Sequence, residues 1–258
     1  MFRIATIEKT RIDAMKVLII GATSAIAKAS ARIYAKLGCS LHLIARREDP
    51  LELVASDLLV RGASKVTYSV LDLNKFAEHK KALISAFTDL GGVDIALICH
   101  GSLPDQVKVE DNFKQALKEI NTNGISVVSL LTELAPKFIE QQQGTIAVIT
   151  SVAGDRGRQP NFVYGSAKSL VSTYLQGLRG KLLEHNVHIV DIRPGLVDSP
   201  MTSQLPKGLL WSSPEQVAQK IVKSIRRGSH TVYAPGYWRI IMLIVRAIPD
   251  FIFKRLKF

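Results

Sequence analysis

Short apolar runs alternate with longer segments of helical periodicity along almost the whole chain. The apolar runs predict strands over 16–20, 41–45, 66–70, 93–98, 145–150, 187–192 and 231–234. The segments between them predict helices over 25–37, 50–60, 76–90, 111–142, 162–185 and 214–226. A strand that is apolar throughout needs cover on both faces, and helical crossovers make consecutive strands parallel. We therefore expect an α/β fold with a doubly wound parallel sheet in three layers, α/β/α.

The same pattern separates one domain from two chain ends. No repeat, low-complexity tract or Pro/Ser-rich linker interrupts residues 15–235, so we expect a single domain there. Residues 1–14 are mixed in charge and lack a long apolar core, which predicts an N-terminal extension that is neither a signal peptide nor an anchor. Residues 236–258 are basic and amphipathic, and we expect them to form a C-terminal tail.

Composition excludes several classes of protein. Apolar residues make up 47% of the chain and charged residues 22%, which argues against a disordered chain or a coiled coil. The two cysteines, Cys39 and Cys99, lie far apart and form no CxxC motif. This excludes a disulfide framework and a cysteine zinc site, and it suits the cytoplasm. No apolar run approaches the ~20 residues of a membrane span, and we expect no metal.

The loop between the first strand and the first helix reads GATSAIA and lies where a dinucleotide phosphate loop would lie. Backbone N–H groups and the helix N-terminus would face a pyrophosphate there. The expected contacts come from Gly21, Thr23, Ser24, Ala25 and Ile26. Because only one of the usual glycines is present, a plain strand-to-helix turn remains an alternative for this loop taken alone.

The ends of the next strands favour a particular nucleotide. Arg46 and Arg47 follow the second strand, where an NAD-specific pocket usually has an acidic residue. A guanidinium binds phosphate well, so we expect NADP(H), with a solvated surface pair as the alternative. The adenine side is expected to contact residues after the third and fourth strands, Asp72, Leu73, His100 and Gly101.

Ser151, Tyr164 and Lys168 give the strongest catalytic signal. Ser151 follows the fifth strand, and Tyr164 and Lys168 are spaced i and i+4 on the next helix, hence on one face. A nearby ammonium favours the phenolate, so we expect Lys168 to lower the pKa of Tyr164 from ~10. Tyr164 would then exchange a proton with a substrate oxygen held by Ser151, while a nicotinamide supplies or takes the hydride.

With these motifs in this order, the chain resembles the short-chain dehydrogenase/reductase family from residue 15 to about 234. The resemblance implies a Rossmann fold and an oxidoreductase that interconverts a carbonyl and an alcohol. It implies catalytic roles for Asn121, Ser151, Tyr164 and Lys168. Asn121, in the segment INTNG, would hold a water that links Lys168 to solvent, and Asn123 is the second candidate for that role.

The resemblance also implies a nicotinamide loop after the sixth strand. Its expected cofactor contacts are Pro194, Gly195, Leu196, Val197 and Ser199. The chain departs from the family at two places. Alanines replace the second and third glycines of the phosphate loop, and ICHG at 98–101 replaces the usual Asn-Asn-Ala-Gly.

The segment expected on the substrate side is apolar, and the tail is both apolar and basic. The segment 203–213 predicts a short lid with Leu205, Leu209, Leu210 and Trp211, and it either favours an apolar substrate or packs on its own domain. From residue 207 onward there are ten basic and two acidic residues, a net charge of +8 out of +12. Because these charges are interleaved with bulky aliphatic residues, we expect a peripheral membrane contact and no nucleic acid. A helix packed in a dimer interface remains the alternative for the tail.

These features predict an NADP(H)-dependent reductase of a lipid-linked or other apolar carbonyl substrate, in the cytoplasm or at the inner face of the membrane. Within the family, the tail and the GATSAIA loop are similar to the reductase component of the polyprenyl-phosphate-linked ribose 2-epimerase, which implies a keto sugar on a lipid phosphate. The alternatives are a soluble reductase of 3-oxoacyl groups or small ketones, and an NADP-binding sensor or scaffold without turnover. The resemblance implies a homodimer or homotetramer that pairs through the two long helices.

Overall fold

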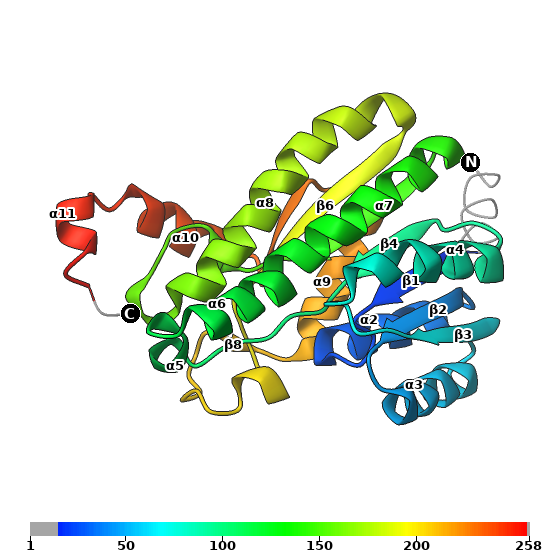
Figure 1. Cartoon of the computed structure of the whole chain (residues 1–258), viewed down its shortest axis with the longest axis horizontal. Helices are drawn as coiled ribbons and strands as arrows, with labels where there is room; N and C mark the ends of the chain where they lie inside the picture. The colour runs from blue at the N-terminus through cyan, green and yellow to red at the C-terminus, as the bar shows by residue number, and fades with distance from the viewer. Residues whose placement is uncertain (1–14, 257–258) are drawn as a thin grey trace, which may run out of the picture.

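The computed structural model describes residues 15–256, so the predicted extension 1–14 and the last two residues of the tail lie outside the described residues. Within that range, seven parallel strands form one sheet in the order β3-β2-β1-β4-β5-β6-β9 (Figure 1). The strands are β1 (Lys16–Ile20), β2 (Ser40–Ala45), β3 (Lys65–Val70), β4 (Ile95–Ile98), β5 (Gly144–Ile149), β6 (Val187–Pro194) and β9 (Thr231–Ala234). A second, two-stranded sheet pairs β7 (Leu196–Val197) with β8 (Trp211–Ser212).

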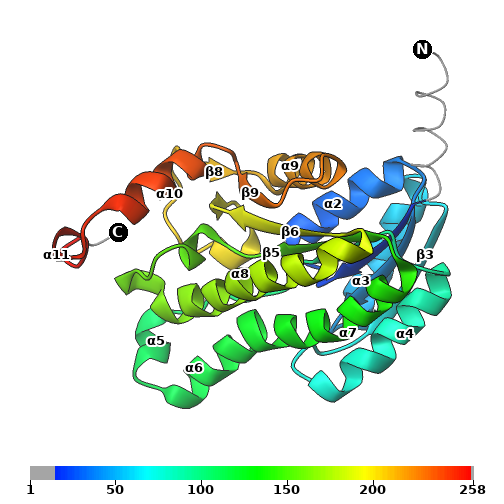
Figure 2. The ribbon, with the colours of Figure 1, turned by 90° about the horizontal axis from the view of Figure 1, so that it is seen from above.

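Helices cover both faces of the main sheet, as Figure 2 shows. One face carries α2 (Ala25–Lys36), α3 (Glu48–Val60) and α9 (Pro214–Arg226). The other carries α4 (His79–Leu90), α7 (Ser126–Gln141) and α8 (Phe162–Leu182). Short helical turns are η1 (Phe76–Glu78), η3 (Val152–Gly154), η4 (Gln159–Asn161), η5 (Leu183–His185) and η6 (Pro200–Thr202). Two separate apolar cores therefore lie above and below the sheet, which confirms the three-layer fold and the single domain.

The region predicted as one helix over 111–142 is divided in the structure. It contains α6 (Phe113–Ile120), the π turn η2 (Asn121–Ile125) and then α7, and a separate short helix, α5 (Gln106–Glu110), precedes it. Asn112 begins α6, because its side-chain oxygen accepts from the N–H of Gln115 at 3.1 Å and caps that helix. In the π turn the N–H of Ser126 donates to the carbonyl of Asn121, which adds one residue to that turn.

The sheet order places a binding cleft at the carboxyl ends of its central strands. β1 pairs with β2 on one side and with β4 on the other, so the chain winds outward in two directions from β1. Loops that follow β1 and β4 diverge at such a switch point, and ligands bind there. Gly21 begins the first of these loops with φ of +80°. A Cβ on Gly21 would lie 2.6 Å from the backbone nitrogen of His100, so this close approach requires glycine.

The last two helices, α10 (Trp238–Ala247) and α11 (Asp250–Phe253), extend beyond the edge of the sheet (Figure 1). The guanidinium of Arg156 holds them through Nη1, which donates to the carbonyls of Val245 at 2.7 Å and Ile248 at 2.5 Å. Its Nη2 pairs with Asp250, and the group lies 3.7 Å from the ring centroid of Phe253. In the described part of the chain, no helix combines the length and the apolar character needed to cross a bilayer.

Candidate active site

The carboxyl ends of the strands open into a cleft of about 660 Å³, which is within the range of small-molecule and cofactor sites. Most residues predicted for the site line this cleft. They are Gly21, Thr23, Ser24, Ala25, Ile26, Arg46, Asp72, Leu73, His100, Gly101, Ser151, Tyr164, Lys168, Pro194, Gly195, Leu196, Val197 and Ser199. Arg47 and Asn121 are the predicted residues that are not part of the lining.

The start of α2 forms one end of the cleft. Ser24 caps this helix, since its Oγ accepts from the N–H of Ala27 at 3.3 Å, and the first turn carries no acidic residue. The partial positive charge of the helix N-terminus therefore faces the cleft without local compensation. This end of the cleft suits the diphosphate of a dinucleotide.

The two arginines after β2 differ in position. Arg46 is exposed and lines the cleft, whereas Arg47 precedes α3 as its N-cap residue and lies outside the lining. At the end of the next strand, the carboxylate of Asp72 accepts from the N–H of Asn74 at 3.0 Å. Only one of the two predicted guanidiniums can therefore contact a ligand in the cleft in this arrangement.

His100, which the sequence placed on the adenine side of the site, also has defined side-chain contacts. Its Nε2 lies 2.7 Å from Oγ of Ser126, whose own hydroxyl donates to the carbonyl of Thr122 at 2.8 Å. The ring therefore carries its proton on Nε2, and Nδ1 is a buried acceptor for which the described residues supply no partner. Burial lowers the pKa of His100 to about 3, so the ring is neutral at ordinary pH.

The side chains that the sequence predicts to be catalytic meet at the end of β5. Tyr164 and Lys168 lie on the same side of α8, with Nζ of Lys168 5.7 Å from the centroid of the Tyr164 ring. Lys168 is almost fully buried, and its Nζ donates to the carbonyl of Ile149 at 3.1 Å. Ser151 begins the turn η3, where its Oγ accepts from the N–H of Ala153 at 3.1 Å.

Burial controls the protonation of both groups. It raises the pKa of Tyr164 to about 12, although a hydrogen bond with Ser151 acts in the opposite direction. This differs from the sequence-based expectation that Lys168 lowers it, because the buried phenol loses its solvation. Burial also lowers the pKa of Lys168 to about 8, although its interactions with Cys99 and Asp191 act in the opposite direction. At neutral pH the phenol is therefore protonated and can act as an acid.

A buried ionic network supports the loop that carries Ser151. The guanidinium of Arg193 pairs with Asp191 at 2.7 Å and with Asp155 at 2.8 Å. The hydroxyl of Tyr233 donates to Asp155 at 2.7 Å, and that of Thr150 donates to Asp191 at 2.5 Å. These contacts join β5, β6 and β9 to the turn after Ser151, and the sequence pattern did not predict them.

The two asparagines of the π turn have different surroundings. The carboxamide of Asn123 is fully buried, and its Oδ1 accepts from the N–H of Ser102 at 2.9 Å. A Cβ on Gly101 would lie 2.8 Å from that oxygen and 3.5 Å from Nζ of Lys168, so both groups border the same point. Asn121 contributes its carbonyl to the π turn and does not line the cleft.

Trp238, which the sequence pattern did not place in the site, closes the cleft beside the nicotinamide loop. A Cβ on Gly195 would lie 1.9 Å from Nε1 of Trp238, so the indole packs directly on this glycine. The same side chain is 6% exposed and packs with Val152 and Met242. The tail thus forms part of the wall of the site.

The cleft is also lined by residues that the sequence did not predict as site residues. They include Leu103, Arg158, Asn161, Met201, Thr202 and Trp238. Of the predicted lid residues, Leu205 lines the cleft, whereas Leu209 is completely exposed and Trp211 begins β8. Of the four lid residues named from the sequence, Leu205 is therefore the one that lines the cleft.

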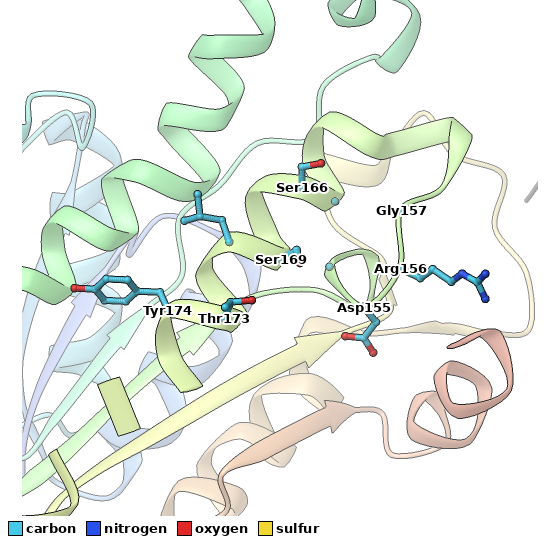
Figure 3. A pocket seen from close by; sticks show the side chains of 10 residues that line it. Asp155, Arg156, Gly157, Ser166, Ser169, Thr173 and Tyr174 are labelled. Carbon is cyan, nitrogen blue, oxygen red and sulfur yellow. The ribbon is translucent and has the colours of Figure 1, made fainter. Parts of the chain in front are cut away.

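A second hollow lies on the outer side of α8 and includes none of the predicted site residues (Figure 3). Small side chains of α8 line it, among them Ser166, Ser169 and Thr173. Figure 3 shows the side chain of Arg156 directed away from α8, in keeping with its contacts to the C-terminal helices. This face of α8 is therefore shallow and carries no catalytic group.

A doubly wound sheet with a serine, a tyrosine and a lysine at its carboxyl edge defines an oxidoreductase that uses a nicotinamide cofactor. The cleft fits such a cofactor, since a helix N-terminus and Arg46 occur at one end and Lys168 beside Tyr164 occurs further along it. No group of three metal-ligating side chains occurs among the described residues. The chain belongs to the short chain dehydrogenase family, whose sequence profile matches residues 15–209.

Curated relatives agree with this assignment, and solved structures agree with the fold. An uncharacterized oxidoreductase of Streptomyces coelicolor is 36% identical over 93% of this chain and 94% of its own length. An uncharacterized oxidoreductase of Mycobacterium tuberculosis is 32% identical over 94% and 97%. The fold matches the crystal structure of gox2181 with a TM-score of 0.79 at 22% identity, covering 90% of this chain and 99% of that one. It also matches a variant of actinorhodin polyketide ketoreductase with NADPH, with a TM-score of 0.78 at 20% identity, covering 87% and 97%.

Proposed function

We propose that the protein is an NADP(H)-dependent reductase that converts a carbonyl group of an apolar substrate to an alcohol. The observation that carries this proposal is the juxtaposition of Tyr164, Lys168 and Ser151 in one cleft with Arg46. The phenol is protonated at neutral pH, as reduction requires, because a protonated tyrosine can give a proton to a carbonyl oxygen.

Each catalytic residue then has a defined role. A nicotinamide held in the cleft would supply the hydride for the new C–H bond at the carbonyl carbon. Ser151 donates a hydrogen bond to the carbonyl oxygen and orients it. Tyr164 transfers its phenolic proton to that oxygen, which completes the alcohol and leaves a phenolate. Lys168, whose pKa is about 8, stabilises the phenolate and can return a proton to it.

Replacing Tyr164 tests the chemical role directly. We expect Tyr164→Phe to reduce carbonyl-dependent NADPH oxidation by ~100-fold or more, since general acid catalysis contributes that much. Tyr174→Phe is the matched control, because it removes a phenolic oxygen from the same helix, where the hydroxyl lies 3.2 Å from Thr132.

NADPH binding, measured in parallel by fluorescence titration, should persist in both variants. Equal turnover by Tyr164→Phe and the parent would refute the acid role. Binding of NADPH without turnover of any carbonyl by the parent protein would favour the sensor alternative.

The two neighbouring arginines test the choice of nucleotide. Arg46 lines the cleft and Arg47 does not. We expect Arg46→Leu to weaken NADPH binding about tenfold, the effect of one charge-assisted contact, and to leave NADH binding nearly unchanged. Arg47→Leu should have little effect on either nucleotide. Equal affinity of the parent protein for NADH and NADPH would contradict the proposed specificity.

The tail supports a peripheral contact with an anionic membrane, and with it a lipid-linked substrate such as a keto sugar on a lipid phosphate. One side of α10 packs on the protein, whereas Ile240, Leu243 and Ile244 on the other side are more than 60% exposed. Arg239 and Arg246 flank these apolar residues. An apolar face bordered by cations suits the interface of an anionic bilayer.

Vesicle binding distinguishes this role of the tail from a dimer contact. We expect Leu243→Glu to reduce sedimentation with anionic vesicles at least tenfold. The same change at Leu53, an exposed residue of α3, should not. Absence of vesicle binding by the full chain, or a dimer that Leu243→Glu dissociates, would refute the membrane role and leave the soluble ketone or 3-oxoacyl reductase as the better reading.

We also propose a homodimer or homotetramer in the cytoplasm, with pairing through α7 and α8. The small side chains along the outer side of α8 support this, since they allow a second helix to approach closely (Figure 3). Analytical ultracentrifugation tests it. Ser169→Trp should shift the protein toward monomer if this face is the interface, and a monomeric parent protein would refute the proposal.

A further inference from the structure

Arg158 is a cation in the cleft that the proposed reduction does not use. It begins the turn η4 and lines the cleft together with Asn161. The two residues are adjacent in space, because the N–H of Asn161 donates to the carbonyl of Arg158 at 3.1 Å. Both therefore reach the cleft from the segment that immediately precedes Tyr164.

Neither side chain is satisfied by the protein. Nε of Arg158 and Oδ1 of Asn161 are buried, and among the described residues neither atom has a hydrogen-bond partner. No carboxylate of the described residues forms an ion pair with Arg158, whereas Arg156 and Arg193 in the same region are paired. Arg158 as a whole is partly buried, and its guanidinium stays protonated and available as a donor.

The position of Arg158 separates it from the nucleotide phosphates. The phosphate loop and Arg46 follow β1 and β2, whereas Arg158 lies after β5. In the sheet, β1 and β4 lie between β2 and β5, so the strand ends are about 14 Å apart at the usual strand spacing. Arg46 and Arg158 therefore enter the cleft from well-separated strand ends.

Glu119 is an acidic residue that also lines the cleft, and its carboxylate is already hydrogen-bonded within the protein. It accepts from the hydroxyl of Ser102 at 2.5 Å and from Nδ2 of Asn123 at 3.3 Å. It forms no ion pair with a cation within the described part of the chain. Arg158 therefore stays a cation of the cleft without an ion-pair partner among the described residues.

We propose that Arg158, assisted by Asn161, binds an oxyanion carried by the substrate, either a phosphate or a carboxylate, at a point away from the reacting carbonyl. A guanidinium donates two parallel hydrogen bonds to such a group, and Asn161 can accept from a neighbouring hydroxyl of the same ligand. The inference deepens the proposed function, on which it rests, by defining the substrate as an anionic carbonyl compound.

Equilibrium binding tests the subsite without turnover. With saturating NADP+ present to fill the nucleotide phosphate site, phenyl phosphate, benzoate and neutral benzyl alcohol are titrated by calorimetry. We expect the parent protein to bind one or both anions at least tenfold more tightly than benzyl alcohol. The preferred anion identifies the oxyanion as phosphate or carboxylate.

Three variants locate the effect. Arg158→Met should abolish the preference for the anion, and Arg158→Lys should restore only part of it because an ammonium lacks the fork of donors. Arg227→Met, which changes the net charge equally at the exposed end of α9, should keep the full preference. Thermal unfolding confirms that each variant is folded.

A parent protein without preference for either anion, or an Arg158→Met variant that retains it, would overturn the subsite. Turnover separates this result from the proposed function. Benzaldehyde and 4-carboxybenzaldehyde, compared as substrates with NADPH, show whether reduction occurs at all. Reduction of the neutral aldehyde without any anion preference would refute the subsite alone. An anion preference without reduction of either aldehyde would refute the reductase activity alone.

Discussion

Removing the charge of Lys168 should make the protein more stable at neutral pH while it destroys activity. Burial lowers the pKa of this lysine from 10.5 to about 8. One pKa unit corresponds to about 1.4 kcal/mol, so keeping the ammonium buried costs the folded state ~3 kcal/mol at pH 7. Lys168→Met avoids this cost but loses the bond from Nζ to the carbonyl of Ile149, worth ~1 kcal/mol. The expected net gain is ~2 kcal/mol.

The pH dependence gives the prediction its sign. The folded pKa lies below the unfolded one, so between pH 8 and 10.5 the unfolded chain binds more protons at Lys168 and the free energy of unfolding rises with pH. Below pH 8 the full cost is present. The stability advantage of Lys168→Met should therefore be largest at or below pH 7 and vanish by about pH 10.

Urea unfolding of both proteins at several values between pH 6.5 and 10 measures the effect. Lys220→Met, at an exposed position of α9, is the control and should change the free energy of unfolding by less than ~0.5 kcal/mol. A Lys168→Met variant that is less stable than the parent at pH 7, or a difference independent of pH, would refute the reasoning that burial dominates at this lysine.

Two further changes have expected magnitudes. Asp155→Asn removes one partner of the buried Arg193 guanidinium and should lower the free energy of unfolding by ~3–5 kcal/mol in urea titrations. The same change at the exposed Asp198 should cost under ~1 kcal/mol. Equal effects of the two changes would show that the network is not buried in solution. Gly195→Ala should destabilise the protein by ~1–3 kcal/mol, because its new methyl group overlaps the indole of Trp238. Combining it with Trp238→Ala should cost less than the sum of the two single changes. Simple additivity in this double-mutant cycle would rule out the contact.

The sequence predicted those elements whose signals are local. Strands 16–20 and 231–234 and helix 214–226 occur with the expected bounds. The helix begins sharply because Ser213 caps it, accepting from the N–H of Gln216 at 3.1 Å. Apolar strands and capped helices are encoded within a few residues, so a pattern can find them.

The catalytic groups followed from spacing, but their electrostatics did not. The i, i+4 spacing placed Tyr164 and Lys168 on one side of α8, as the structure shows. The pKa of Tyr164 depends on how completely the surrounding chain excludes water, and that surface is assembled from segments far apart in sequence. The spacing therefore identified the pair, but the pKa shift expected for the phenol of Tyr164 had the wrong direction.

Other site residues reach the cleft only through tertiary packing. Trp238 belongs to the tail, and Arg158 belongs to a loop without periodicity. Neither position carries a motif that could distinguish it from a surface residue. The sequence shows a tryptophan just beyond the last strand and an arginine a few residues before Tyr164. Only the fold brings the two side chains to the same cleft.

The docking of Trp238 on Gly195 affects how shortened forms of this chain should be interpreted. A truncation that ends before α10 removes the outward apolar face, and the same cut strips one wall from the cleft. Loss of activity in such a shortened protein would then have two causes: the cleft has lost a wall, and the proposed membrane contact is gone. Point substitutions at outward positions such as Leu243 leave the indole in place, and they alone can tell the two causes apart.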